Sequence, residues 1–124
     1  MRPQAFPKEY RLLRRSEFRL VYEAGQRRSA PLGVVFYRPN GLSMTRLGIT
    51  APTKMGGAVL RNRVKRRVRE VFRLNRLTIP AGWDIVLNPR EAVARVEFTK
   101  LEHELLRLFP RHVPAGPTEE ARPQ

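Results

Sequence analysis

The sequence predicts a single α+β domain, in which a small sheet is covered by about three helices. Its length of 124 residues is that of one domain. Apolar residues make up 41% of the chain, enough for a folded core. Segments with helical and strand periodicity follow in the order helix, strands, helix, strand, helix, and glycine and proline separate them.

The sequence of the N-terminal quarter, residues 1–25, predicts an extended arm followed by a short helix. Residues 1–10 are basic, and we expect the chain to run extended as far as about residue 15. A helix is predicted over residues 16–24, with Ser16 as its N-cap and Gly25 just after its end. Because Arg19 stands where a capping box has glutamate, no capping box is expected.

Two strands follow this helix. Residues 34–37 are β-branched and aromatic, and residues 47–50 alternate apolar with small or polar side chains. The Pro-Asn-Gly sequence at 39–41 indicates a turn between the two strands. A third strand is expected near the start of the sheet.

The second half predicts a long helix over residues 58–75, a buried strand at 84–87 and a last helix over 97–109. The apolar stripe of the long helix consists of Leu60, Val64, Val68, Val71 and Phe72. The stripe of the last helix consists of Phe98, Leu101, Leu105 and Leu108. Residues 113–124 contain three prolines and no apolar period, so we predict a disordered tail after a domain at 11–112.

The charge restricts the function. There are 25 basic and 11 acidic residues, for a net charge of +14. Such an excess favours nucleic acid as the partner, ahead of an anionic membrane surface and of mere solubility. There is no cysteine, which excludes disulfides and thiolate metal sites. Without a membrane-spanning run or a secretory signal pattern, a cytoplasmic protein is expected.

The basic helix is the most informative segment. Residues 61–76 contain eight basic residues and one acidic residue. At about 100° per residue, one broad face carries Arg61, Lys65, Arg69, Arg73 and Arg76. The flanks of that face carry Arg63, Arg66 and Arg67. The alternative is an ordinary solvated face, but such faces mix signs, whereas like charges repeated four residues apart cost stability. We therefore predict an anionic partner, for which arginine is suited by its planar fork.

Aromatic residues suggest a second site. Phe18 and Tyr22 lie four residues apart on the first helix, and Phe36 shares a strand face with Val34. The opposite side of the first helix is expected to carry mostly Leu20, Val21 and Ala24. Exposed rings beside arginines stack unpaired bases, at about 1–3 kcal/mol per base. The alternative is that these rings belong to the core, which is the more common use of such spacing.

Residues suited to catalysis are not grouped in the sequence. His103 and His112 lack neighbours that would complete a metal site or a triad, and no pair of inward carboxylates is readable. We therefore expect no catalytic residue and no metal ligand in the protein itself. Its role would be to bind and position, with the chemistry belonging to a partner.

Several motifs together resemble a known family. The string GAVLRNRVKRRVRE at residues 57–70 is the most specific of them. Weaker motifs are Arg11-Leu12, Glu17-Phe18, Val21-Tyr22 with Gly25, Arg46 to Thr50, and Asp84-Ile85-Val86. In order and spacing they resemble the protein component of bacterial ribonuclease P from about residue 11 to residue 109. The loop departs from the usual Ser-Lys-Lys, with Pro52-Thr53-Lys54, and Pro89 displaces a common arginine to Arg90.

The resemblance implies a sandwich of helices on a small, mostly antiparallel sheet, with a left-handed βαβ crossover. It implies two partners, the catalytic RNA subunit and the 5′ leader of precursor tRNA, with magnesium bound by the RNA, and it implies no DNA or membrane partner. The implied RNA-binding residues are Lys54, Arg61, Asn62, Arg63, Lys65, Arg66, Arg67 and Arg69. The implied leader cleft consists of Phe18, Tyr22 and Phe36. The alternatives are a ribosomal protein or general RNA chaperone, and a nuclease that acts without RNA.

Overall fold

The computed structural model describes residues 8–114 and has the predicted order of elements. The helices and strands are α1 (Arg15–Ala24), β1 (Gln26–Ala30), β2 (Gly33–Pro39), β3 (Arg46–Ile49), α2 (Ala58–Leu74), β4 (Trp83–Pro89) and α3 (Phe98–Leu108). Three 3-10 turns are η1 (Lys8–Tyr10), η2 (Thr53–Met55) and η3 (Glu91–Ala94). The arm at residues 1–7 and the tail at 115–124 lie outside the described residues, so the boundaries predicted there stay predictions.

The sheet is mixed, with strand order β1-β2-β4-β3. β1 is the third strand expected at the start of the sheet, and it pairs antiparallel with β2. β2 pairs antiparallel with β4, whereas β3 and β4 are parallel neighbours. This confirms a small, mostly antiparallel sheet. The two faces of β4 are both buried, with Ile85 and Leu87 in one apolar cluster and Val86 in the other, which explains the apolar run at the centre of the strand.

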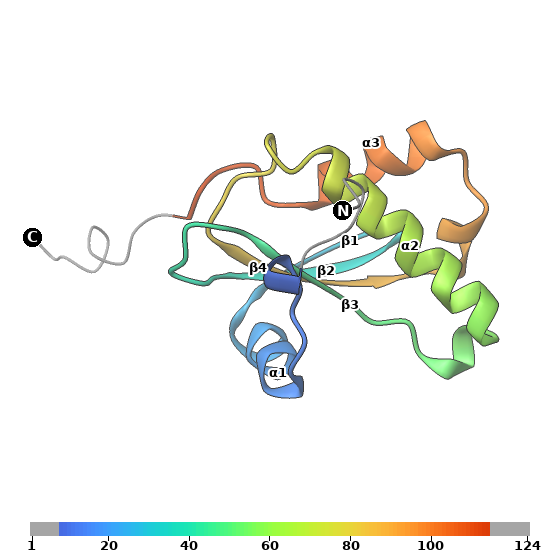
Figure 1. Cartoon of the computed structure of the whole chain (residues 1–124), viewed down its shortest axis with the longest axis horizontal. Coiled ribbons are helices and arrows are strands. Elements are labelled where there is room, and N and C mark those ends of the chain that lie inside the picture. Colours follow the sequence, from blue (N-terminus) through green and yellow to red (C-terminus); the bar gives the residue numbers. More distant parts are fainter. Residues whose placement is uncertain (1–7, 115–124) are drawn as a thin grey trace, which may run out of the picture.

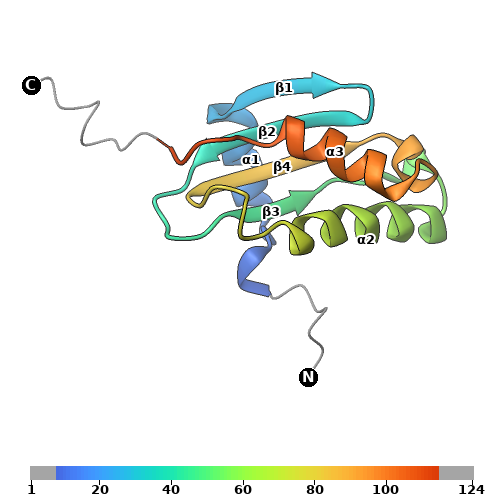
Figure 2. The ribbon, with the colours of Figure 1, turned by 90° about the horizontal axis from the view of Figure 1, so that it is seen from above.

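Helix α2 connects the parallel pair, and the crossover is left-handed. In Figure 2 the viewer looks from the α2 side, β3 and β4 both run to the right, and β4 lies above β3. The expectation from the family resemblance is therefore confirmed, although about 98% of such connections are right-handed.

The three helices form layers on the two faces of the sheet. Figure 1 shows α2 and α3 on one face and α1 on the other. The predicted stripes of α2 and α3 pack with Val35, Tyr37, Leu47, Ile85 and Leu87, and all their members are buried except Leu60 and Phe98, which are partly buried. A smaller cluster under α1 contains Leu12, Val21 and Val86. Phe36 packs against this smaller cluster and Tyr37 belongs to the larger one, so the two neighbouring rings lie on opposite faces of the sheet.

The prediction for the start of α1 was wrong. The helix begins at Arg15, with Arg14 rather than Ser16 as the N-cap residue. Glu17 is therefore the third helical residue, and its carboxylate accepts a hydrogen bond from the Arg14 N–H at 3.1 Å. Glutamate has this same role in a capping box, although none was expected. The segment before the helix is not a free arm, because the Leu12 N–H donates to the Leu47 carbonyl.

Within residues 8–114, no helix is long and apolar enough to cross a membrane.

Candidate nucleic-acid interface

Helix α2 presents its charged residues around a buried apolar stripe. Val64, Val68, Val71 and Phe72 pack against the sheet. On the outer side, Asn62, Arg63 and Arg66 are exposed. The remaining candidates on this helix, Arg61, Lys65, Arg67 and Arg69, are partly exposed. The structure therefore brings seven of the eight predicted RNA-binding residues together on one helix.

Part of this charge is used inside the protein. Arg67 donates from its two terminal nitrogens to the Val93 carbonyl at 2.8 Å and the Val96 carbonyl at 2.7 Å. Arg63 donates from Nε to the Ala94 carbonyl at 2.7 Å. These bonds fasten η3 and the residues after it to α2. An RNA contact by Arg67 remains a prediction, but its guanidinium already bridges two carbonyl oxygens.

Arginines at the C-terminal end of α2 and just after it also make contacts within the protein. Arg73 forms a bidentate pair with Glu70, with distances of 2.6 and 3.1 Å, and this hydrogen bonding raises the pKa of Arg73. Arg76 lies over the ring of Tyr10, with 4.8 Å from the guanidinium carbon to the ring centroid. Arg61, at the other end of the helix, donates from Nε to the Gly56 carbonyl at 3.1 Å. Of the broad basic face predicted from the sequence, Lys65 and Arg69 are therefore the two residues whose side chains make no hydrogen bond, ion pair or ring contact with any residue within 8–114.

Lys65 and Arg69 extend the basic surface around the β3 edge of the sheet. Together with Arg11, Phe18 and Gly48 they line a hollow of about 100 Å³. Burial lowers the pKa of Arg69, and the nearby positive charge of Arg11 lowers it further. A phosphate in this position would relieve that repulsion. The hollow connects the basic helix with the start of α1.

The predicted aromatic residues gather between α1 and the sheet. Phe18, Tyr22 and Phe36 are each half-buried and pack against the small cluster under α1. The rings of Tyr22 and Phe36 meet edge to face, with centroids 4.8 Å apart. Each ring therefore contributes to the core and keeps an exposed part, and the stacking of bases on these rings stays a prediction.

Two further contacts fix the rings. The Tyr22 hydroxyl donates to Asn88 Oδ1 at 2.8 Å and lies 2.9 Å from the Thr50 hydroxyl. Phe18 lies over Gly48, where an added Cβ would come within 2.6 Å of the ring. Leu20 and Ala24 do point away from the sheet, but the prediction that Val21 joins them was wrong, since Val21 is fully buried. The apolar arc of α1 therefore centres on Val21.

Lys54 lies on η2, in the loop that precedes α2, and its side chain is exposed. It lines a pocket of about 640 Å³ with Thr50, Asn88 and Met55. Because Thr50 and Asn88 also contact Tyr22, this pocket continues the aromatic site towards the basic loop.

Sequence reasoning missed a polar network under α1. Arg46 on β3 pairs with Asp84 on β4 and with Glu17 on α1. Its sequence signal is an acid directly before the buried run of β4, at a position that strand alternation places on the α1 face. Among the residues that the structure describes, no group of His, Asp and Glu is arranged to hold a metal ion.

Comparison with known proteins identifies the family. The family model for ribonuclease P matches residues 6–113. The chain belongs to the ribonuclease P protein family. The ribonuclease P protein component of Thermotoga maritima is 40% identical over 112 residues, which cover 87% of this chain and 96% of that protein.

Solved ribonuclease P proteins share the fold as well. The RNase P protein from Thermotoga maritima superposes with a TM-score of 0.76 at 41% identity, over 86% of this chain and 98% of that one. A mutant of the Staphylococcus aureus RNase P protein with defective mRNA degradation activity gives a TM-score of 0.74 at 30% identity, over 82% and 86% of the two chains. In the present ribonuclease P protein, the basic helix and the aromatic site lie on opposite faces of the sheet and approach each other at the β3 edge.

Proposed function

We propose that the chain is the protein subunit of ribonuclease P, the ribonucleoprotein that removes the 5′ leader from precursor tRNA. The supporting observation is α2, whose apolar stripe packs on the sheet while its remaining sides carry an arginine-rich surface. Such a surface suits the phosphate backbone of a large RNA. The protein would bind the catalytic RNA through this helix and the Lys54 loop.

In this proposal the RNA subunit, together with magnesium, performs the hydrolysis, and the protein binds and positions. A net charge of +14 reduces the repulsion between two polyanions, the catalytic RNA and the precursor tRNA. Closer approach of their phosphates would also help the complex to retain magnesium ions, which raises magnesium affinity indirectly. Both partners are expected where tRNA is made, in the cytoplasm.

The 5′ leader would bind along the half-buried rings of Phe18, Tyr22 and Phe36. Unpaired bases stack on such rings with little regard to sequence. The hollow lined by Lys65, Arg69 and Arg11 lies beside Phe18, so backbone phosphates of the same strand have cations within reach. A ribosomal protein or a general RNA chaperone would use the same charge without distinguishing precursor from mature tRNA, and no comparison favours either.

Removing Arg66 is expected to weaken binding of the catalytic RNA and to flatten its salt dependence. Arg66 is exposed and has no hydrogen bond or ion pair within residues 8–114. For one lost phosphate contact, the slope of log K against log salt should change by about 0.7–0.9. The measurement is a filter-binding titration of Arg66→Ala at four salt concentrations.

The matched control is Arg73→Ala on the same helix, which removes the same charge from a guanidinium already held by Glu70. We expect a smaller change of slope for this control. An Arg66→Ala slope equal to that of the wild type would remove this part of α2 from the RNA interface.

A further inference from the structure

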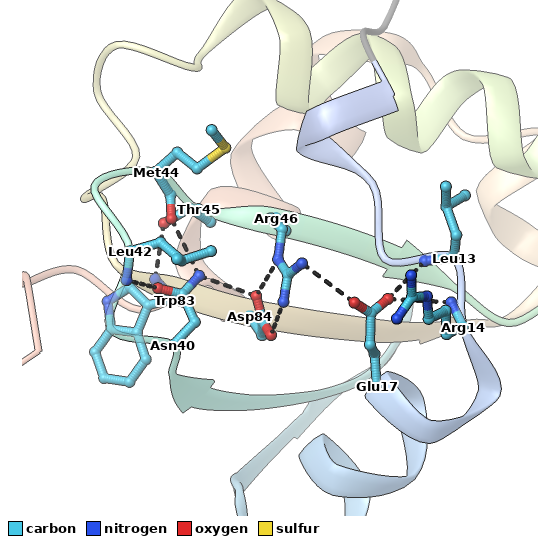
Figure 3. Close-up of polar contacts among 10 residues, drawn as sticks. All are labelled: Leu13, Arg14, Glu17, Asn40, Leu42, Met44, Thr45, Arg46, Trp83 and Asp84. Atoms are coloured by element: carbon cyan, nitrogen blue, oxygen red, sulfur yellow. Dashed lines mark hydrogen bonds and ion pairs between the residues drawn. The ribbon is translucent and has the colours of Figure 1, made fainter.

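A polar network joins three elements on the α1 face of the sheet (Figure 3). The guanidinium of Arg46 on β3 binds both oxygens of Asp84 on β4, at 2.9 and 2.7 Å. The remaining terminal nitrogen of Arg46 donates to Glu17 Oε2 on α1, at 3.2 Å. Asn40, in the turn after β2, donates to Asp84 Oδ1 at 2.9 Å. One arginine thus connects the sheet to the first turn of α1.

The sheet side of this network is firmly held. The side chain of Asp84 is only 6% exposed, so its charge requires a partner. Arg46 and Asp84 stand directly opposite each other in the parallel β3–β4 pair, and the bidentate geometry fixes the guanidinium plane. The hydrogen bonds that Arg46 donates to the Asp84 carboxylate raise the pKa of Arg46, as does the negative charge of Glu17. Two carboxylates, those of Asp84 and Glu17, therefore bind the guanidinium of Arg46.

On α1, the carboxylate of Glu17 links the first turn of the helix to Arg46. Its Oε1 accepts from the N–H groups of Leu13 and Arg14, both at 3.1 Å, while Oε2 faces Arg46. Partial burial acts to raise the pKa of Glu17, but these N–H groups and the charge of Arg46 lower it overall. The carboxylate therefore stays charged at neutral pH and determines where α1 begins relative to β3.

Residues close to Glu17 on α1 and to Arg46 on β3 belong to the aromatic site. Phe18 follows Glu17, and Gly48 lies two residues after Arg46 on the same face of β3. The ring of Phe18 lies over Gly48. Apolar packing alone holds α1 weakly, because Val21 is its one fully buried side chain among the described residues. A shift of the first turn would therefore carry the Phe18 ring with it.

We propose that Glu17 and Arg46 are positioning residues for leader recognition, which hold the first turn of α1 so that Phe18 is preorganised to meet an unpaired base. The proposal rests on the proposed function and assigns to this pair a role in substrate selection, separate from binding of the catalytic RNA. A preorganised ring binds better because less ordering accompanies binding.

The test uses the reconstituted holoenzyme with Glu17→Gln. The amide keeps a carbonyl oxygen for the N–H groups of Leu13 and Arg14 but removes the charge that faces Arg46. The readout is the ratio of affinities for precursor tRNA and mature tRNA, because an unaltered leader site keeps that ratio even when overall binding changes. We expect the ratio to fall about three- to tenfold, with the affinity for catalytic RNA unchanged.

The matched control is Glu23→Gln, on the same helix and exposed, with no hydrogen bond or ion pair to any described residue. Both substitutions remove one negative charge, which by itself favours RNA binding. A fall of the ratio confined to Glu17→Gln therefore cannot come from net charge. Arg46→Lys is the second variant, since an ammonium keeps the charge but cannot bind both carboxylates as the fork does. Its ratio should lie between those of wild type and Glu17→Gln.

If Glu17→Gln and Arg46→Lys both kept the wild-type ratio of affinities for precursor and mature tRNA, the positioning role would be overturned. This would hold even if thermal unfolding showed that both variants were destabilised. A ratio near one for the wild-type holoenzyme would instead overturn the proposed function, and this inference with it.

Discussion

Replacing Arg46 with alanine is expected to lower the free energy of unfolding by about 3 kcal/mol, because it leaves the buried carboxylate of Asp84 without its cation. Asn40 would remain as a hydrogen-bond donor, but an amide does not balance the charge. Glu17 would lose its ion pair as well. Equilibrium urea unfolding at neutral pH measures the difference.

The control for this substitution is Arg27→Ala on the edge strand β1, where the side chain is exposed. Exposed charges contribute little to stability, so this variant should stay within about 0.5 kcal/mol of the wild type. A loss below about 1 kcal/mol for Arg46→Ala would mean that the bidentate pair does not hold Asp84 in solution.

Replacing Arg67 with alanine is expected to cost about 2 kcal/mol of stability, although the residue lies in the most basic segment of the chain. Its guanidinium bridges the carbonyls of Val93 and Val96, and hydrogen bonds from charged donors are worth about 1.5–3 kcal/mol. Without Arg67, α2 loses one hydrogen bond to η3, at Val93, and one to the segment after it, at Val96. The measurement is again urea unfolding.

Arg66→Ala is the natural comparison, since it removes an adjacent arginine that has no hydrogen bond or ion pair to any described residue and should leave stability nearly unchanged. The two variants should show opposite behaviour, with Arg67→Ala affecting stability and Arg66→Ala affecting the salt dependence of RNA binding. If Arg67→Ala flattened the salt slope while leaving stability intact, its guanidinium would bind RNA rather than the carbonyls of Val93 and Val96.

The elements were predictable where periodicity is strong. The stripe from Leu60 to Phe72 identifies α2, because a buried side must repeat with the period of its element, and the apolar run at 85–87 identifies β4 as a buried strand. The start of α1 was not predictable in this way. Its N-terminal contacts depend on the side chain of Glu17 reaching back to Arg14, and several residues near this point can serve as N-cap.

The site was predictable as a set of residue types but not as a set of contacts. A helix wheel separates Val64 and Val68 from the arginines, yet it cannot show that η3 folds over the Arg63 and Arg67 flank. Similarly, Arg46 and Asp84 are 38 residues apart, and only the parallel pairing of β3 and β4 brings them together. Handedness was the least accessible feature, since the general rule for crossovers favours the opposite hand.

We propose that this chain assists an RNA enzyme rather than acting alone. The most direct test measures cleavage of precursor tRNA at low magnesium with the protein alone, with a bacterial ribonuclease P RNA alone, and with both together. If the protein is an accessory subunit, we expect efficient cleavage at the mature 5′ end only in the sample that contains both protein and RNA. Cleavage that is unchanged by adding the protein, or cleavage by the protein alone, would contradict it.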